Sequence, residues 1–203
     1  MERTTVRVAV FGVFSAEKFS PRAFGDALCD VAPRTPGFSN VWPLLEVTLA
    51  GKQGGSIHWA SFNARFAVEK TKTVNMHCDV YCVHLSLALD SEMMHEQYNQ
   101  AQVAVFLYHQ NDLRSWHYVQ QLVANAFTGV YQPQKRLIVA LLATLNEAVA
   151  VKPASARAFA ASYGMDYTHV VLENDINRSV VLNHIVSGIL RPASLEHDGN
   201  APS

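Results

Sequence analysis

The chain has 203 residues, of which 49% are hydrophobic and 16% charged, and its formal net charge is −1. That length and apolar content suffice for one sizeable core, and the near-neutral charge excludes the broad basic surface typical of nucleic-acid-binding proteins. No apolar run reaches the roughly 18–20 residues that a membrane-spanning helix needs. The three cysteines lack the spacing of a disulfide framework, which is typical of a reducing compartment, so we predict a cytoplasmic protein.

The first predicted elements are a buried strand and a helix. The strand covers Val6–Val13, an almost unbroken apolar run of the kind found in central parallel strands. Ser20 followed by Pro21 predicts a helix start, because a serine hydroxyl caps the first turn and a proline at that position needs no N–H. Residues from Ala32 to Trp42 are rich in Pro, Gly and Ser, and predict an exposed loop.

Two β-hairpins are predicted in the middle of the chain. One pairs Leu45–Ala50 with Ser56–Phe62 across a glycine-rich turn. The other pairs Lys70–Met76 with Val80–Leu89, and its turn is His77–Asp79, because Asp tolerates a left-handed backbone.

The remaining two-fifths alternates strands with helices. The predicted strands cover 103–108, 136–142 and 167–172; the predicted helices start at Asp112 or Ser115, run over 154–163 and end at Gly164, and run from about 174 to just before Pro192. This alternation predicts a three-layer α/β fold: a mainly parallel central sheet with helices on both faces, and an extra or extended β-hairpin in the middle. We expect one domain over residues 1–191 and a disordered tail over 192–203.

Two segments resemble the small GTPase superfamily, in particular its Rab- and Ras-like members. Tyr98-Asn-Gln-Ala-Gln-Val-Ala-Val-Phe-Leu-Tyr-His-Gln-Asn-Asp-Leu-Arg-Ser-Trp116 resembles the Rab-type run YYRGAxGxxLVYDxTxxxSF without gaps. Ala156-Arg-Ala-Phe-Ala-Ala-Ser-Tyr-Gly-Met-Asp-Tyr167 resembles the helix, turn and strand that precede the family's last guanine-binding loop. The resemblance implies a P-loop GTPase-like fold and, for an active member, GTP or GDP with Mg²⁺ as the bound cofactor.

The phosphate-binding motif of that family is degenerate in this sequence. Its form is G-x-x-x-x-G-K-[ST], in which backbone N–H groups and the lysine hold phosphates and the hydroxyl holds Mg²⁺. The segment Gly12-Val-Phe-Ser-Ala-Glu-Lys-Phe19 keeps only Gly12 and Lys18, which are the candidate cofactor-binding residues. Glu17 adds a carboxylate where an anion must approach, and Phe19 removes the magnesium-binding hydroxyl. The alternative for Lys18 is a solvated loop lysine.

The other nucleotide-binding motifs have no clean match. The D-x-x-G motif falls on Trp59–Asn63 or on Asp90–Met93, depending on which strand is the family's third, and the sequence leaves both open. The guanine-reading N-K-x-D falls on Leu141–Thr144, and the last guanine-binding loop on Val171–Glu173. Charge-assisted hydrogen bonds contribute roughly 1.5–3 kcal/mol each, so the loss of several predicts a large loss of nucleotide affinity.

The sequence therefore predicts a pseudoGTPase: a catalytically inactive, small-GTPase-like protein that binds protein partners or forms part of a larger assembly. We expect no catalytic residues, no metal, no cofactor, no nucleic-acid partner, and no transmembrane segment or lipid anchor. One alternative is a divergent GTP- or GDP-binding switch that uses Lys18 and atypical contacts. Another is an unrelated α/β enzyme, for which Ser15-Ala-Glu-Lys18 matches the S-x-x-K of serine acyl-enzymes but lacks their other motifs.

Two further groups of residues each allow two interpretations. In His77-Cys-Asp-Val-Tyr-Cys-Val-His84, strand alternation places Cys78, Cys82 and His84 on one face, which allows either a zinc site or two buried thiols. A group of aromatic residues near the first hairpin is either core or a partner-binding surface, since aromatic residues concentrate interface energy. This group comprises Trp42, Trp59 and Phe62.

Overall fold

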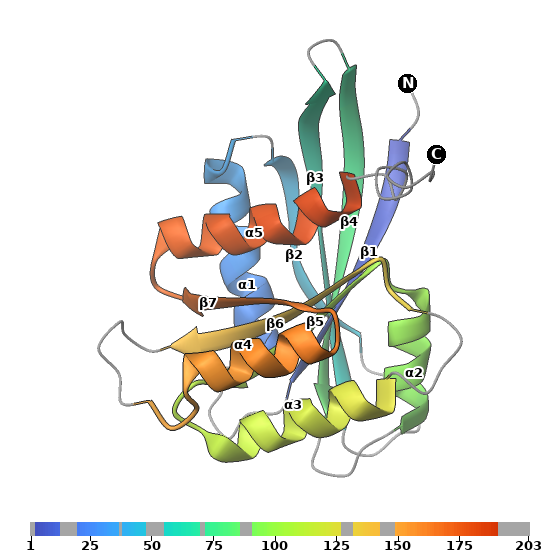
Figure 1. Cartoon of the computed structure of the whole chain (residues 1–203). Coiled ribbons are helices and arrows are strands. Elements are labelled where there is room, and N and C mark those ends of the chain that lie inside the picture. The colour runs from blue at the N-terminus through green and yellow to red at the C-terminus, as the bar shows by residue number, and fades with distance from the viewer. Residues whose placement is uncertain are drawn as a thin grey trace, which may run out of the picture.

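A computed structural model of the chain describes residues 3–12, 20–36, 38–47, 55–69, 72–85, 91–126, 132–142 and 149–190. Its strands are β1 (Arg3–Gly12), β2 (Phe38–Val47), β3 (Gly55–Glu69), β4 (Lys72–Leu85), β5 (Val103–His109), β6 (Lys135–Leu142) and β7 (Asp166–Val171). Its helices are α1 (Pro21–Val31), the short 3₁₀ helix η2 (Ala32–Arg34), α2 (Ser91–Gln100), α3 (Leu113–Ala126), α4 (Pro153–Ser162) and α5 (Asp175–Leu190). Figure 1 shows these elements as one α/β body.

The strands form one seven-stranded sheet in the order β2-β3-β4-β1-β5-β6-β7. From β4 to β7 neighbouring strands run parallel, whereas β2 and β3 are antiparallel additions at one edge. At the centre Val10 lies beside Cys82 of β4 and Val105 of β5. The predicted α/β class and mainly parallel sheet are therefore confirmed.

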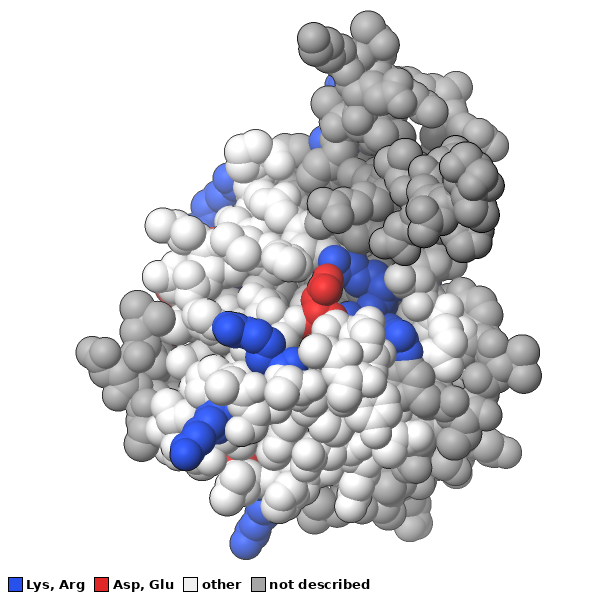
Figure 2. Space-filling model, viewed as in Figure 1, with Lys and Arg blue, Asp and Glu red and all other residues white. Residues whose placement is uncertain are grey.

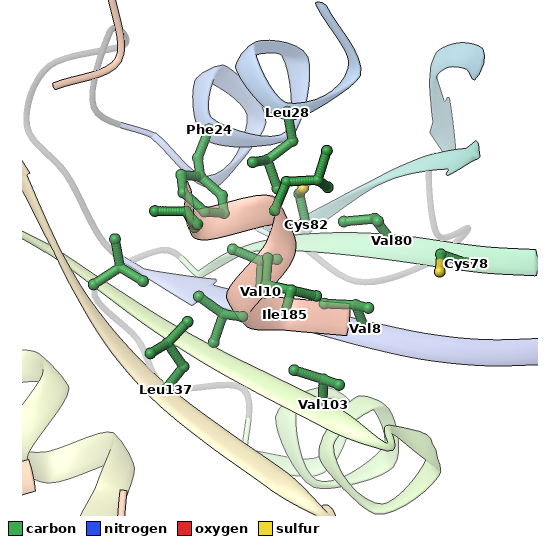
Figure 3. Close-up of a cluster of buried hydrophobic side chains, with 14 of the residues drawn as sticks. Val8, Val10, Phe24, Leu28, Cys78, Val80, Cys82, Val103, Leu137 and Ile185 are labelled. Atoms are coloured by element: carbon green, nitrogen blue, oxygen red, sulfur yellow. The ribbon is translucent and has the colours of Figure 1, made fainter. Parts of the chain in front are cut away.

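Strand alternation divides the core into two layers, one on each face of the sheet. On one face Val6, Val8 and Val10 pack with apolar side chains of α1 and α5, among them Phe24, Leu28 and Ile185 (Figure 3). On the other face, side chains of β1 pack with α2, α3 and α4; the β1 members are Ala9 and Phe11. Each fully buried Val, Leu, Ile or Phe stabilises the fold by roughly 1.5–3 kcal/mol relative to an exposed position.

Local sequence signals account for where the helices begin and end. Ser20 caps α1 as expected, with its hydroxyl oxygen accepting a hydrogen bond from the Ala23 N–H at 3.1 Å. Asp112 precedes α3, and its carboxylate accepts a hydrogen bond from the Arg114 N–H at 2.9 Å. After α4, Gly164 has a φ of 61°, the left-handed conformation expected at a helix end.

Three sequence-based expectations about the first half of the chain were wrong or incomplete. The hairpin with a turn at His77–Asp79 does not exist, because that segment lies in the middle of β4, which pairs with β3 on one side and β1 on the other. The expected loop from Ala32 to Trp42 instead contains η2 and the start of β2. The helix α2 was not anticipated.

Of the first predicted hairpin the structure describes the antiparallel pairing of β2 with β3, while the turn lies outside the described residues. Val47 lies beside Ile57, and Leu45 beside Trp59, in antiparallel register. Among the described residues no helix is long and apolar enough to cross a membrane. The expected tail, residues 192–203, lies outside the described residues.

Candidate functional site

The carboxyl ends of the parallel strands are where open α/β sheets bind ligands, so this edge is the candidate site. Gly12 is the last residue of β1 and is buried beside His84 of β4. Lys18, the second predicted phosphate-binding residue, lies outside the described residues, as does the whole Ser15–Lys18 segment. What the structure describes here is the frame around that loop: the end of β1 and the start of α1.

At the start of α1, several backbone N–H positions are unavailable to a ligand. Pro21 has no N–H, the Ala23 N–H is bonded to the Ser20 hydroxyl, and the Phe24 N–H donates to the Ser20 carbonyl oxygen at 3.0 Å. A helix N-terminus binds phosphate through free N–H groups of its first turn. Ser20 is itself buried, so its cap lies inside the structure, where an anion would have to displace it in order to reach the same donors.

Polar groups of the loop after β5 are likewise hydrogen-bonded within the protein. The Ser115 hydroxyl oxygen accepts a hydrogen bond from the His109 N–H at 3.0 Å and donates to the Asp112 carbonyl oxygen at 2.8 Å. Because these bonds go to the backbone, the sequence proximity of Ser, His and Asp does not form a catalytic triad. Gln110 is buried, with its N–H donating to the Leu141 carbonyl oxygen and its own carbonyl oxygen accepting from Val151, both at 3.0 Å.

The loop after β7 serves as the cap of α5. The Asn174 side-chain oxygen accepts a hydrogen bond from the Asn177 N–H at 3.0 Å, and the Asn174 carbonyl oxygen accepts one from the Arg178 N–H, also at 3.0 Å. Glu173, the last residue of the predicted guanine-binding loop, is exposed. These polar groups therefore stabilise a helix start and form no cradle for a base.

The predicted guanine-reading segment is apolar and largely part of the core. Leu141 and Leu142 are buried in β6, while Ala143 and Thr144 lie outside the described residues. Neither leucine has a side-chain acceptor for the two hydrogen bonds that guanine would donate. The residues present at the described part of this edge do not fit a guanine nucleotide with magnesium.

Of the two possible D-x-x-G positions, only one leaves the sheet at this edge. Trp59–Asn63 lies inside β3, an antiparallel strand, where Ser61 is buried. The segment after β4 follows a strand that runs parallel to β1 and therefore ends at the same edge. Asp90, the acidic residue of that second position, lies outside the described residues.

The cysteines of β4 behave as buried thiols. Cys78 and Cys82 both lie in the core layer that contains α1 and α5 (Figure 3). Burial raises the pKa of the Cys78 thiol to about 12 and raises the pKa of Cys82 further. The described part of the chain contains no group of three or more His, Cys, Asp or Glu side chains that could hold a metal ion. The side chain of His84 is outside the described set.

The members of the aromatic group near the first hairpin, which was interpreted as either core or a partner-binding surface, differ in burial. Phe62 is fully buried in the core, whereas Trp59 is half-buried on the opposite face of the sheet. The Trp59 Nε1–H donates to the Asp79 carboxylate at 3.2 Å, and His77 Nε2 lies 3.3 Å from the same carboxylate oxygen. This polar network could not be read from the sequence, because its members lie on β3 and β4, whose register local patterns do not specify. The side chain of Trp42 is not described.

No protein-family model matches this sequence, and no curated protein matches it either.

Proposed function

We propose that this protein is a small-GTPase-like pseudoenzyme, which neither binds nor hydrolyses GTP appreciably and acts by binding protein partners. The mainly parallel sheet with helices on both faces is compatible with a P-loop-like α/β fold. The assignment to small GTPase-like proteins rests on the resemblance of Tyr98–Trp116 and Ala156–Tyr167 to Rab-type segments.

The observation that carries the proposal is the closed start of α1. A phosphate loop presents free N–H groups to an anion, and the helix that follows adds its positive end. Here Ser20 occupies one of those donors, Pro21 removes another, and Glu17 stands where the motif has its second glycine. Phe19 also lacks the hydroxyl that would hold Mg²⁺.

The loss of nucleotide chemistry leaves partner binding as the use of the scaffold. A nucleotide-driven switch needs two conformations that the ligand distinguishes by differential affinity. Without nucleotide affinity the surface stays in one state, so we expect constitutive binding, either to a single partner or within a larger assembly.

Nucleotide content and affinity test the proposal directly. The purified protein is denatured and its supernatant is chromatographed for GDP and GTP, and the native protein is titrated with a fluorescent GTP analogue with and without Mg²⁺. We expect no nucleotide in the supernatant and no saturable binding. Stoichiometric guanine nucleotide, or tight binding that the Lys18→Ala variant abolishes, would instead establish the divergent switch.

A further inference from the structure

One face of strands β1, β3 and β4 carries a group of half-buried polar and aromatic side chains. Strand alternation puts the odd-numbered residues of β4 on the opposite face from the core layer that contains Cys78, Val80 and Cys82. The register places their partners from β1 and β3 on the same face. We call this group the strand patch: Arg7, Trp59, His77, Asp79 and Tyr81.

The helices on this face cover only one end of the three strands. Phe11, near the end of β1, packs against Tyr98 of α2 with ring centroids 6.4 Å apart. Tyr81 lies at the border of that core layer. Farther along β4, 18% of the Asp79 side chain and 21% of the His77 side chain are exposed. Figure 1 shows α2, α3 and α4 near one end of β3 and β4, whose other end extends beyond these helices. The strand patch therefore reaches from the border of the core to the surface.

Contacts within the strand patch hold its side chains in place. The Trp59 Nε1–H donates to Asp79 Oδ1 at 3.2 Å, and His77 Nε2 lies 3.3 Å from the same oxygen. The Arg7 guanidinium lies over the Tyr81 ring at 4.2 Å. Side chains that are restricted in this way lose less conformational entropy when a partner binds. Trp, Tyr and Arg are also the residue types that contribute most of the binding energy of protein interfaces.

Arg7 and Asp79 are neighbours of opposite charge that do not pair with each other. They lie side by side in the register of β1 and β4, where opposite charges ordinarily attract. The Arg7 guanidinium instead contacts the Tyr81 ring, and among the residues that the structure describes it has no carboxylate partner. Both side-chain contacts of Asp79 use Oδ1. The strand patch therefore presents one positive and one negative group with which a second molecule can pair.

We propose that the strand patch is the interface of a homodimer, in which the patches of two copies meet face to face about a two-fold axis. The inference goes beyond the proposed function and does not depend on it. A patch with one charge of each sign is complementary to itself, because Arg7 of each copy can pair with Asp79 of the other. A nucleic acid would instead need a larger area of positive charge. Figure 2 shows a mostly uncharged described surface in its view, with some Lys and Arg side chains gathered beside an acidic one.

The position of the helices selects one orientation of the axis. Stacked sheets lie about 10 Å apart, which is the diameter of a single helix. An axis along the strands would bring the two α2 helices to the same end of the interface, where they would collide. An axis across the strands, along the row of Arg7 and Asp79, puts the two α2 helices at opposite ends. Tyr81 of each copy then lies opposite His77 of the other, since both are two residues from Asp79.

Sedimentation velocity of the full chain over a series of concentrations tests the proposal. We expect a monomer–dimer equilibrium. Arg7→Glu and Asp79→Lys should each raise the dissociation constant at least about tenfold, because each substitution brings like charges together. An equimolar mixture of the two variants should dimerise again, since each new charge then meets an opposite charge on the other variant. The matched control, Arg22→Glu, makes the same change of charge at an exposed position of α1, on the other face of the sheet, and should dimerise like the wild type.

Several results would overturn the inference. They are a wild type that stays monomeric at every concentration, an Arg7→Glu variant that dimerises as tightly as the wild type, an equal loss in Arg22→Glu, or folded variants that stay monomeric when mixed. Thermal unfolding checks that each variant is folded. If Asp79→Lys does not fold, Asp79→Asn, which keeps an acceptor for Trp59, replaces it and should still weaken the dimer. Guanine nucleotide in the purified protein would overturn the proposed pseudoenzyme but leave the dimer result standing, so the two failures can be told apart.

Discussion

The hydroxyl of Thr35, just after η2, lies 3.0 Å from the hydroxyl of Ser179 on α5, although 144 residues separate them in sequence. Thr35 is buried and also donates to the Val31 carbonyl oxygen at 3.0 Å. This contact joins the end of α1 to the last helix, so the first and last parts of the described chain support each other.

Four charged side chains, two of them next to Thr35 and Ser179 in sequence, form a closed ring of ion pairs. Arg178 contacts both Asp30, at 3.0 Å, and Asp175. Arg34 contacts the same two carboxylates at 2.6 and 2.7 Å. Only 11% of the Arg178 side chain is exposed, against 54% for Arg34, so Arg178 is the member whose pairing matters most for stability.

Replacing Arg178 should therefore destabilise the protein. Arg178→Met keeps the apolar stem but removes both ion pairs and leaves Asp30 and Asp175 with fewer partners. We expect the free energy of unfolding to fall by about 1–3 kcal/mol, measured by denaturant titration. The matched control is Arg22→Met, which removes an exposed pair with Asp26 at 3.9 Å and should cost less than about 0.5 kcal/mol. Equal losses in both variants would contradict the assigned role of Arg178.

The cap at the start of α1 gives a second prediction. Ser20→Ala removes the acceptor of the Ala23 N–H and should lower the free energy of unfolding by about 1 kcal/mol. Ser20→Asp retains an acceptor and favourable charge at the positive helix end, so it should cost much less. If Ser20→Ala were neutral in denaturant titration, the cap would contribute nothing, and the closed helix start would lose its energetic basis.

The sequence predicted the parallel part of the fold better than the antiparallel part, for physical reasons. Buried parallel strands appear in the sequence as continuous apolar runs. Ser20–Pro21 marks the start of a helix and Gly164 the end of one, because these residue types favour the backbone conformations found there. In β4, however, His77–Asp79 reads as a turn, because Asp79 has a turn-forming side chain whose actual hydrogen-bond partner, Trp59, is distant in sequence. Partners of this kind depend on register, which local patterns do not specify.

For the candidate site, the sequence predicted only which residues of the phosphate-binding motif are missing. The missing glycine and hydroxyl around Lys18 follow from motif spacing alone. The closure of the helix starts by Ser115 and Asn174 does not, because each depends on a backbone group several residues away being brought into place.

Gly164 gives a third prediction. Its φ of 61° is strained for a residue with a side chain, so Gly164→Ala should lower the free energy of unfolding by roughly 1–2 kcal/mol. A Cβ at this position would lie 3.6 Å from Arg136 Nη2, an ordinary contact, so the cost is in the backbone and no clash adds to it. Gly164→Asn should therefore cost less than Gly164→Ala, because Asn tolerates the left-handed region. The reverse order, measured by thermal unfolding, would show that the side-chain space decides.

The thiols give a prediction about reactivity and alkaline stability. Burial raises the pKa of Cys29 to about 12 and that of Cys78 to about 12, both from 9.0, and it also raises the pKa of Cys82. Because the thiolate is the nucleophile, all three should react far more slowly with a disulfide reagent in the native protein than in guanidinium chloride. Cys29, the one that is only half-buried, should react first. The sign for stability follows from linkage: above pH 9 the unfolded thiols lose protons that the native ones keep, so the contribution of the thiols to stability should be constant well below pH 9 and should fall as pH rises above it. A Cys78→Ala/Cys82→Ala variant should show a shallower fall in denaturant titrations at alkaline pH, and an unchanged slope would assign the effect to other groups.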